Sequence, residues 1–432
     1  MKKTLYQTAI RTVELSRPLQ ALTNLQEYTC VRILVTIRGQ LLSCLHIANF
    51  HQSVSVSRLR DAIIDTLALK LLKKGDVFNK ETVWANALIM LVKHFVQNEP
   101  EPVRLPADVS ASVVVATLDR PDDLRECLRS LMAQVSPRHV EIVVVDNNPS
   151  SGLTLPVVSD FPQVVLVNEP RRGLAYARNA GFVASKGDIC IATDDDVRFP
   201  PDWLEKLLTP FSRNDVMVVT GNVLPYELES QAQNMFEDYG GLGRGFERFE
   251  VNEHWFERNR FKAVPTWEIG ATANAAFRTT IFNHPNIGLM NEALGPGMPS
   301  GVGEDTYLFY KVLKAGFTVV YEPTAYVWHK HRRDMSKLRH QLFNYSKGHV
   351  AYHLVTMVRD HDLRALVRLA IELPLGYFWR IKERLRGRSS FPFSLILLEI
   401  FGHLAGPLAL WKSHKIVKRL GRSNQYIPVS QR

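Results

Sequence analysis

The sequence predicts an α/β fold: a mostly parallel sheet with crossover helices, preceded by a small α+β module and followed by a helical region. Two observations carry this prediction. From residue 112 onwards, short continuous apolar runs alternate with helical patterns, which is the order expected of a parallel sheet. Several of these runs end in polar side chains, and parallel strands bring such ends together at the sheet edge where ligands bind.

Composition and charge indicate a globular protein with one locally basic region. Hydrophobic residues make up 46% of the 432 residues and charged residues 22%, and the formal net charge is +10. Residues 359–432 contain fourteen Lys or Arg against five Asp or Glu, so most of the positive excess lies there. The pattern predicts a basic surface confined to one region.

Cysteine usage and the amino terminus both predict a cytoplasmic protein. The cysteines show no zinc-ligand spacing and stand beside apolar residues, as expected of buried free thiols in a reducing compartment. They are Cys30, Cys44, Cys127 and Cys190. The first residues after Met-Lys-Lys lead into no apolar core of signal-peptide length, so we expect an untargeted start.

Residues 1–100 are expected to form an accessory module with no chemistry of its own. Two apolar, β-branched runs, residues 31–36 and 41–47, flank a short turn and predict a hairpin. Residues 55–72 carry apolar side chains at helical spacing after a serine cap. The polar, proline-rich residues 101–111 are expected to link this module to the next domain.

Residues 112–348 are expected to form the main domain. Short apolar runs predict buried strands, and patterns with one apolar face predict the helices between them. The strands are expected at residues 112–117, 140–145, 164–167 and 189–193, and the helices at residues 121–132 and 173–184. Thr117, Asp146 and the acidic residues after the last strand should then meet at one edge of the sheet.

Asp194, Asp195 and Asp196 follow the last of these strands directly. Side chains alternate along an extended chain, so Asp194 and Asp196 are expected to point to one side and Asp195 to the other. Two carboxylates at i and i+2 suit Mg²⁺ or Mn²⁺, which take diphosphate oxygens as further ligands. A solvated acidic turn is the alternative, and the position at a strand end disfavours it.

A histidine pair in Trp328-His-Lys-His331 supplies a candidate third metal ligand. On an extended segment one of the two imidazoles would point inward and the other outward. Neutral imidazole is a serviceable ligand for Mn²⁺. His329 and His331 are equal candidates for this role, and an ordinary surface pair is the alternative.

Asp305 is the candidate general base. Two glycines precede it, and residues 306–315 form a predicted helix whose N-terminal amides favour a carboxylate. Glu304 is adjacent and projects differently, so the two acids are not expected to do the same job. A simple helix-capping acid is the alternative interpretation of Asp305.

Several motifs occur in an order that resembles the family 2 glycosyltransferases. In chain order they are Thr117-Leu-Asp-Arg-Pro, a strand ending in Asp146, Arg172-Gly-Leu-Ala-Tyr-Ala-Arg-Asn-Ala-Gly181, the acidic triplet followed by Pro201-Asp-Trp-Leu, Gly303-Glu-Asp305, and Trp328-His-Lys-His331. The resemblance covers roughly residues 112–333. It implies a GT-A type, Rossmann-like fold and an inverting enzyme that depends on a nucleotide sugar.

The resemblance also implies roles for individual residues at the donor. The nucleotide and diphosphate would contact Thr117, Arg120, Asp146, Arg172, Asn179, Asp194 and Asp195. Asp194 and Asp196, with one of the two histidines, would hold the divalent metal cofactor, Mn²⁺ or Mg²⁺. Asn179 would support the donor loop from within a helix.

Further roles concern catalysis and the acceptor. The resemblance assigns the base to Asp305 and places Glu304 near the acceptor or in support of the site. Trp267 and Asn274 lie in segments that resemble the part of the family that closes the donor pocket, and both are candidates to contact the acceptor. A tryptophan can stack on a sugar ring, but a place in the core is an equal alternative for Trp267.

The chain is therefore expected to be a metal-dependent, hexosyltransferase-like glycosyltransferase. Its donor would be a nucleotide-diphosphate sugar, with a UDP-sugar expected first, and its acceptor a hydroxyl of a glycan or lipid-linked molecule in cell-surface polysaccharide or glycolipid synthesis. A nonenzymatic nucleotide-binding regulator is one alternative, which the presence of Asp305 disfavours. A nucleic-acid-binding protein is the other, but no basic cluster lies within a recognition motif, so no nucleic acid is expected as a partner.

Residues 349–432 are expected to form a helical region, both basic and apolar, that contacts a membrane. Residues 391–411 are largely apolar but are broken by Glu399, His403 and Pro407, so they are borderline for a spanning helix. Flanking bases favour attachment in the plane of an anionic surface, at the inner face of the cytoplasmic membrane. Helices packed on the catalytic domain are the alternative.

Overall fold

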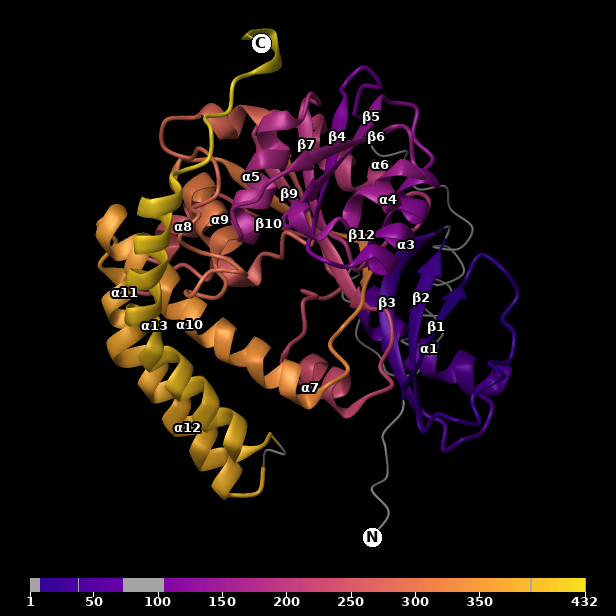
Figure 1. The fold of residues 1–432 in the computed structure, drawn as a ribbon. Helices are drawn as coiled ribbons and strands as arrows, with labels where there is room; N and C mark the ends of the chain where they lie inside the picture. The colour runs from indigo at the N-terminus through magenta and orange to yellow at the C-terminus, as the bar shows by residue number, and fades with distance from the viewer. Residues whose placement is uncertain (1–7, 38, 73–104, 389–390, 432) are drawn as a thin grey trace.

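The computed structural model describes residues 8–37, 39–72, 105–388 and 391–431, and these form three regions (Figure 1). A small three-stranded sheet lies beside a nine-stranded sheet, and a group of long helices follows them towards the end of the chain. The predicted fold class is confirmed: a mostly parallel α/β sheet with a small α+β module before it and a helical region after it.

The N-terminal module pairs β1 (Thr8–Glu14) in parallel with β2 (Cys30–Ile37), which pairs in antiparallel with β3 (Gln40–Ala48). α1 (Val56–Leu72) packs on this sheet and closes a separate apolar core. The predicted hairpin and helix are confirmed. β1 was not predicted, because its sequence mixes polar and apolar residues and the strand is mostly half-buried.

The predicted linker lies partly outside the described residues, which resume at Leu105. From there the chain packs on the main domain, since the guanidinium of Arg138 donates hydrogen bonds to the carbonyls of Leu105, Pro106 and Val109. Ala111 already belongs to the first strand of the large sheet.

The large sheet has the strand order β10-β12-β9-β11-β7-β4-β5-β6, with β8 paired to β12. β4 (Ala111–Thr117), β5 (Val140–Asp146), β6 (Val164–Asn168) and β7 (Ile189–Asp194) are parallel neighbours. These strands match the four apolar runs in the sequence. The runs are continuous because β4, β5 and β7 are buried on both faces.

The remaining strands make the sheet mixed. β11 (Asn274–Arg278) runs antiparallel between β7 and β9 (Val216–Pro225), and β12 (Thr318–His329) runs parallel to β9. β10 (Phe249–Val251) lies at the edge, and β8 (Val197–Arg198) pairs with the last residues of β12.

Helices cover both faces of this sheet (Figure 1). α3 (Pro121–Met132), α4 (Thr154–Ser159) and α6 (Trp203–Leu208) contribute buried residues to one apolar cluster. α5 (Leu174–Ala184) and α9 (Glu304–Lys314) contribute to the cluster on the opposite face. The bounds predicted for the helix at 121–132 agree with α3, whose Pro121 occupies the first turn where its missing N–H costs nothing.

Two short helices lie between β9 and β11. They are α7 (Gln231–Tyr239), which begins with a capping box at Ser230, and α8 (Glu253–Arg258), which is capped by Asn252. Ser230 accepts a hydrogen bond from the backbone of Gln233, whose side chain bonds back to the N–H of Ser230.

The C-terminal region is built from long helices (Figure 1). In chain order these are α10 (Met335–Arg359), α11 (Arg364–Val367), a π-helical segment (Arg368–Glu372), α12 (Leu373–Leu385) and α13 (Phe393–Leu420). The predicted domain boundary after residue 348 falls inside α10, so the main domain and the C-terminal region share this helix.

α13 packs along α10 through its small residues. A Cβ atom added to Gly402 would lie 2.7 Å from the Cβ of Ser346, and one added to Gly406 would lie 2.6 Å from the Cβ of Val350. Glycine is therefore required at both positions for the helices to approach this closely. Among the described residues α13 is also the one helix long and apolar enough to cross a membrane, with a mean hydropathy of 1.7 over its most apolar window, 39% of which is buried.

Candidate active site

A large cleft separates the main domain from the C-terminal helices. Its volume is about 1540 Å³, which exceeds the ~300–1,000 Å³ of a typical single-ligand pocket. Asp194 and Arg172 line it at the carboxyl ends of the strands, and Asp305 lines it at the start of α9. Asp194 ends β7 and His329 ends β12, so the polar ends of two strands meet at this cavity, whereas Thr117 and Asp146 are not among its lining residues.

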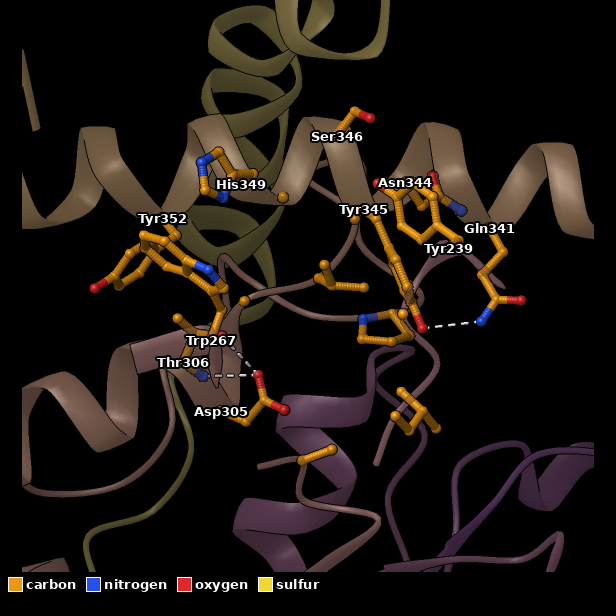
Figure 2. A pocket seen from close by; sticks show the side chains of 18 of the residues that line it. Tyr239, Trp267, Asp305, Thr306, Gln341, Asn344, Tyr345, Ser346, His349 and Tyr352 are labelled. Atoms are coloured by element: carbon orange, nitrogen blue, oxygen red, sulfur yellow. Dashed lines mark hydrogen bonds between the residues drawn. The ribbon is translucent and has the colours of Figure 1, made fainter. Parts of the chain in front are cut away.

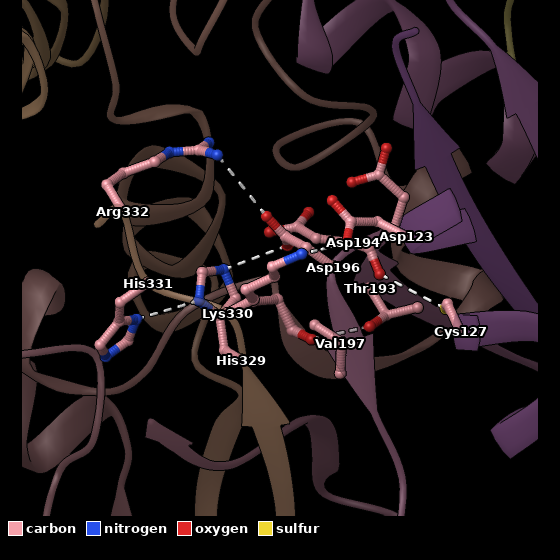
Figure 3. Close-up of polar contacts among 12 residues, drawn as sticks. Asp123, Cys127, Thr193, Asp194, Asp196, Val197, His329, Lys330, His331 and Arg332 are labelled. Carbon is pink, nitrogen blue, oxygen red and sulfur yellow. Dashed lines mark hydrogen bonds and ion pairs between the residues drawn. The ribbon is translucent and has the colours of Figure 1, made fainter. Parts of the chain in front are cut away.

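Asp194, Asp196 and His329 come together at this edge of the sheet (Figure 3). One ligand atom from each lies within 4.8 Å of the others. The local cause is the short strand β8, in which Val197 pairs with His329 of β12. We call residues 194–196 the acidic turn. The backbone N–H of Lys330 donates to the carbonyl of Asp196 at 3.1 Å, which holds the end of β12 against this turn.

The chemistry of these three residues fits a divalent cation. Oδ1 of Asp196 is buried and accepts no hydrogen bond within the described part of the chain, and its neighbour is Nε2 of His329 at 3.3 Å. Burial lowers the pKa of His329, although the Asp196 charge opposes this, so the imidazole is held in its neutral, ligating form. Two carboxylates and a neutral imidazole are a suitable donor set for Mn²⁺ or Mg²⁺.

His331 points away from this group (Figure 3). Its Nε2 lies 2.9 Å from Oε1 of Glu237 on α7, and its ring packs edge-on against Phe236. The alternation expected along an extended segment is therefore present, and it places His329 at the carboxylates. Nδ1 of His331 lies 3.2 Å from Nδ1 of His329, so the buried pair is in contact.

Asp195 is buried and shares Nη1 of Arg120 with Asp196. Its Oδ2 accepts a hydrogen bond from Thr117 at 2.8 Å, and its Oδ1 accepts one from Arg120 at 3.2 Å. Burial and the charge of Asp196 raise the pKa of Asp195 to about 7. Burial alone would also raise the pKa of Asp196, but His329 and Arg120 outweigh it and hold that pKa low.

Arginine side chains gather around the acidic turn. Nη1 of Arg120 donates to Oδ2 of Asp196 at 2.6 Å and remains partly exposed in the cleft. Arg332 lies with its Nη1 3.9 Å from the same oxygen and is half exposed. Arg332 was not singled out in the sequence, where it appeared as one base in the run Lys330-His-Arg-Arg.

The donor residues predicted at β5 and in the loop after β6 differ in their relation to the cleft, because Asp146 does not line it. Asp146 is buried and accepts the N–H of Asn148 at 2.9 Å. Asn147 was not predicted as a site residue, yet its amide holds the loop that carries Arg172: it donates to the carbonyl of Arg171 and accepts the N–H of Gly173, both at 2.9 Å. Arg172 itself lines the cleft.

Asn179 is buried in α5 and does not line the cleft. Its side chain donates to the carbonyl of Met290 at 3.0 Å and accepts the N–H of Met290 at 2.9 Å. The Asn179 side chain therefore pairs with both backbone groups of Met290, as a neighbouring strand would, and this holds the loop before α9 in place. This position supports a loop of the site, and direct contact with the donor does not fit it.

Arg178 joins the two acidic parts of the site and was missed in the sequence. It is 2% exposed; Nη2 donates to Oδ1 of Asp194 at 2.7 Å and Nη1 donates to Oε1 of Glu304 at 3.0 Å. A single arginine in an otherwise apolar helix was the available signal, because a fully buried cation requires anionic partners.

Glu304 and Asp305 open α9 and face different surroundings. Glu304 is buried, and burial together with the Asp305 charge raises its pKa to about 8 despite the contact with Arg178, whose charge is shared with Asp194. Oδ1 of Asp305 accepts the N–H of Thr306 at 2.7 Å, whereas Oδ2 has only long contacts of 3.4 Å with Thr272.

The two candidate acceptor residues occupy different places. Trp267 lines the cleft above Asp305 (Figure 2), packed edge-on against His349 with ring centroids 5.1 Å apart. Asn274 is fully buried, accepts from Trp203 and donates to the carbonyls of Asn222 and Ala325. The acceptor role expected of Asn274 does not fit this position, because all its polar atoms bind the core.

The sequence is similar to those of known glycosyltransferases. Residues 112–284 match the family described as Glycosyl transferase family 2. A glucosyl-dolichyl phosphate glucuronosyltransferase of Haloferax volcanii is 34% identical over 173 residues, which are 38% of this chain and 55% of the relative. The succinoglycan biosynthesis protein ExoM of Rhizobium meliloti is 25% identical over 220 residues, which are 49% of this chain and 64% of the relative.

Among solved structures, a mannosyltransferase from Pyrobaculum calidifontis in complex with GDP-Man and Mn²⁺ aligns with a TM-score of 0.41 and 16% identity, over 85% of this chain and 89% of that chain. The chain spans less than two thirds of the length of each of the two curated relatives.

Proposed function

The chain carries a family 2 glycosyltransferase domain at residues 112–284, and we propose that it transfers a sugar from a nucleotide-diphosphate donor to an acceptor hydroxyl with inversion. One observation carries the proposal: the carboxylates of Asp194 and Asp196 and the imidazole of His329 converge in the same cleft that Asp305 lines. A cation-binding group and a free carboxylate facing one cavity are the parts that such a displacement needs.

The donor diphosphate belongs at the acidic turn. Asp194, Asp196 and His329 would hold a divalent cation there, and Mn²⁺ or Mg²⁺ would each suit this set. A bound cation would neutralise part of the negative charge of the diphosphate. Arg172 and Arg332 line the same part of the cleft and can pair with phosphate oxygens, which strengthens charge stabilisation as the nucleoside diphosphate leaves.

Asp305 is assigned the base. Its Oδ2 is nearly free of hydrogen-bond donors, while Oδ1 is fixed by Thr306, so one oxygen orients the carboxylate and the other can accept a proton. The acceptor oxygen forms a bond to the anomeric carbon as the bond from that carbon to the diphosphate oxygen breaks. The electron pair leaves with the diphosphate, and the acceptor proton moves to Oδ2 of Asp305.

We also propose the class of donor nucleotide and the class of acceptor. A UDP-sugar is the donor we would test first. The Haloferax relative is named for action on a glucosyl-dolichyl phosphate, which supports a lipid-linked acceptor as an alternative to a free glycan. Synthesis of cell-surface polysaccharide or glycolipid at the inner face of the cytoplasmic membrane would bring soluble donor and anchored acceptor together.

A peripheral membrane contact is proposed through one face of α13. Its exposed apolar side chains recur every three or four residues, as one stripe along the helix: Phe393, Leu397, Phe401, Leu404, Leu408 and Trp411. Lys412, Lys415, Lys418 and Arg419 follow at its end, and Nζ of Lys415 lies 3.6 Å from the centre of the Trp411 ring. An apolar stripe with flanking bases suits an anionic membrane surface.

The proposal is tested with a panel of nucleotide sugars, each with Mn²⁺ or Mg²⁺, scored for released nucleoside diphosphate with and without membrane extract as a source of acceptor. We expect release from one donor class, lost in excess EDTA. Retention of mixed DNA on a filter by the same preparation, without release from any donor, would favour the nucleic-acid alternative, and nucleotide binding without turnover would favour the regulator.

A further inference from the structure

We propose that the part of the cleft enclosed by α10, the π-helical segment, α12 and α13 binds uncharged sugar residues of the acceptor beyond the hydroxyl that reacts. We call it the helical chamber and define it by Arg368, Glu372, Tyr377, Arg380, Glu399 and His403, all of which line the cleft. This inference rests on the proposed function and names the chemical class of the second substrate.

The space is larger than one substrate requires. The cleft of about 1540 Å³ is lined both by Asp194 of the acidic turn and by the residues of the helical chamber. Asp305 also lines the cleft, and Figure 2 shows it beneath Trp267, with His349 on α10 above. Trp267 stands next to the chamber, because the guanidinium of Arg368 lies 4.9 Å from the centre of its ring. An acceptor placed at Asp305 can therefore extend into the chamber.

The chamber wall is a continuous set of polar and aromatic groups from several helices. Nε of Arg368 donates to Nε2 of His349 at 3.1 Å. The hydroxyl of Tyr377 lies 3.0 Å from Oε2 of Glu399 and 3.1 Å from Nδ1 of His403, and Arg380 donates to both oxygens of Glu399. Planar groups that offer paired donors and acceptors beside aromatic rings match the hydroxyl pairs and the apolar faces of sugars.

Charge balance within the chamber favours a neutral ligand. Arg368 pairs with Glu372 at 3.2 Å, and Arg380 pairs with Glu399, so the two cations are matched by two carboxylates. Burial lowers the pKa of His403 to about 4, so this ring is uncharged at neutral pH. A phosphate or carboxylate entering here would meet no unpaired cation among the described lining residues, and its desolvation would go uncompensated.

The backbone also marks this region. Arg368–Glu372 is a π-helical segment, a distortion that is frequent at functional sites, and its first and last residues both line the cavity. Gly376 lines the cavity from α12, and a Cβ atom added to it would meet no atom within 4 Å. Open space lies in front of this exposed glycine, so a large side chain can be added at the chamber wall without displacing its neighbours.

The test compares Gly376→Trp with Gly376→Ala in the full chain. Alanine is a better helix former than glycine and leaves the chamber open, whereas tryptophan occupies it. The probe is a printed array of uncharged and anionic glycans, read by bound labelled protein. We expect the wild type and Gly376→Ala to bind uncharged glycans, and Gly376→Trp to lose about tenfold or more of that binding, equivalent to about 1.4 kcal/mol.

Other results overturn the inference. Binding confined to phosphorylated or carboxylated glycans, equal binding by Gly376→Trp, or no glycan binding by the wild type would each remove the neutral sugar site. Donor hydrolysis is measured on the same three preparations and should be unchanged. If hydrolysis occurs and the array result fails, the chamber assignment is wrong and the proposed function stands; if no donor is hydrolysed, the proposed function itself fails.

Discussion

Two adjacent carboxyl groups at the start of α9 receive different properties from their surroundings. Glu304 is buried in the cleft wall against Arg178, whereas Asp305 lines the cavity with one oxygen nearly unbonded. Sequence adjacency alone predicted that the two would differ, since neighbouring side chains on a helix point in different directions. Arg178 completes the contrast, and only the folded structure shows its contacts with both Glu304 and Asp194.

Replacing Asp305 with asparagine separates binding from chemistry. The amide retains the shape of the carboxylate and its contact with Thr306, but it cannot accept the proton from the acceptor. We expect donor affinity close to wild type and turnover reduced on the order of 10²-fold or more. Donor affinity from calorimetry and turnover from released nucleoside diphosphate give the two values. A collapse of donor affinity with the loss of turnover would mean that Asp305 holds the donor.

Glu304 predicts a pH dependence of stability with a definite sign. Its pKa is raised from 4.5 to about 8, so between these values the folded state holds a proton that the unfolded state has released. The contribution of Glu304 to stability therefore falls as pH rises through this window. Glu304→Gln keeps a neutral side chain at every pH and should flatten that part of the profile.

The measurement is urea unfolding of wild type and Glu304→Gln at about pH 5 and about pH 8. The free energy of unfolding of the variant minus that of the wild type should be larger at about pH 8 than at about pH 5. Asp195 titrates in the same direction and is common to both proteins, so the difference between them isolates Glu304. If this difference in free energy of unfolding is instead smaller at the higher pH, Glu304 is charged in the folded state.

At the scale of elements, strongly patterned segments were predictable from sequence and irregular ones were not. The four central strands were recognisable because sheets covered on both faces need continuous apolar runs. β11 and β12 were not identified as strands, since neither shows a clean alternating pattern and tertiary pairing decides their conformation. The choice between His329 and His331 depended on β8, a two-residue strand without a sequence signal of its own.

The last helix, α13, has one packed face and one exposed apolar face. One face of α13 packs on α10 through Gly402 and Gly406, and the opposite face exposes large apolar side chains. The apolar length of residues 391–411 could not separate packing from membrane contact, because one face of the helix is packed while the other is exposed and apolar. The resemblance read from the motifs agrees with the family match over residues 112–284.

The exposed stripe on α13 predicts binding to anionic membranes. Phe401 and Leu404 are 62% and 72% exposed, so replacing both with glutamate removes apolar area and adds negative charge without disturbing a core. The full chain should cosediment with anionic liposomes, more weakly in high salt, because each nearby base contributes about 1 kcal/mol at such a surface. The double variant should remain in the supernatant.

A matched control is Leu155→Glu on α4, a side chain that is 60% exposed outside the C-terminal helices. It should sediment with liposomes as the wild type does. Equal sedimentation of the control and the α13 double variant would show that the stripe does not bind the membrane. The stripe would then no longer support a lipid-linked acceptor.

For the whole molecule, polar contacts connect the N-terminal module to the active site. Nη1 of Arg32 on β2 lies 2.6 Å from Oε2 of Glu237, and Oε1 of Glu237 lies 2.9 Å from Nε2 of His331. His331 in turn touches His329, the ligand candidate. No sequence pattern placed the first module beside the site, because Arg32 is 205 residues from Glu237 along the chain.

This arrangement predicts that Arg32 stabilises the docking of the module. Arg32→Met keeps most of the side-chain volume but leaves Oε2 of Glu237 without its charged donor in a mostly buried position. We expect the free energy of unfolding to fall by about 1.5–3 kcal/mol, the range for hydrogen bonds to charged groups. Arg60→Met on α1 removes an arginine that is 60% exposed and should change stability by about 0.5 kcal/mol or less.

The central claim is that the acidic turn binds the donor in a metal-dependent way. Calorimetric titration tests it most directly: the donor identified in the panel of nucleotide sugars is titrated into wild type and into Asp196→Ala. With Mn²⁺ present the wild type should bind the donor, and EDTA should abolish binding. Asp196→Ala should fail to bind under either condition while unfolding as the wild type does, because water cannot replace a charged ligand beside a diphosphate. Metal-dependent binding of wild-type strength by the variant would contradict the account.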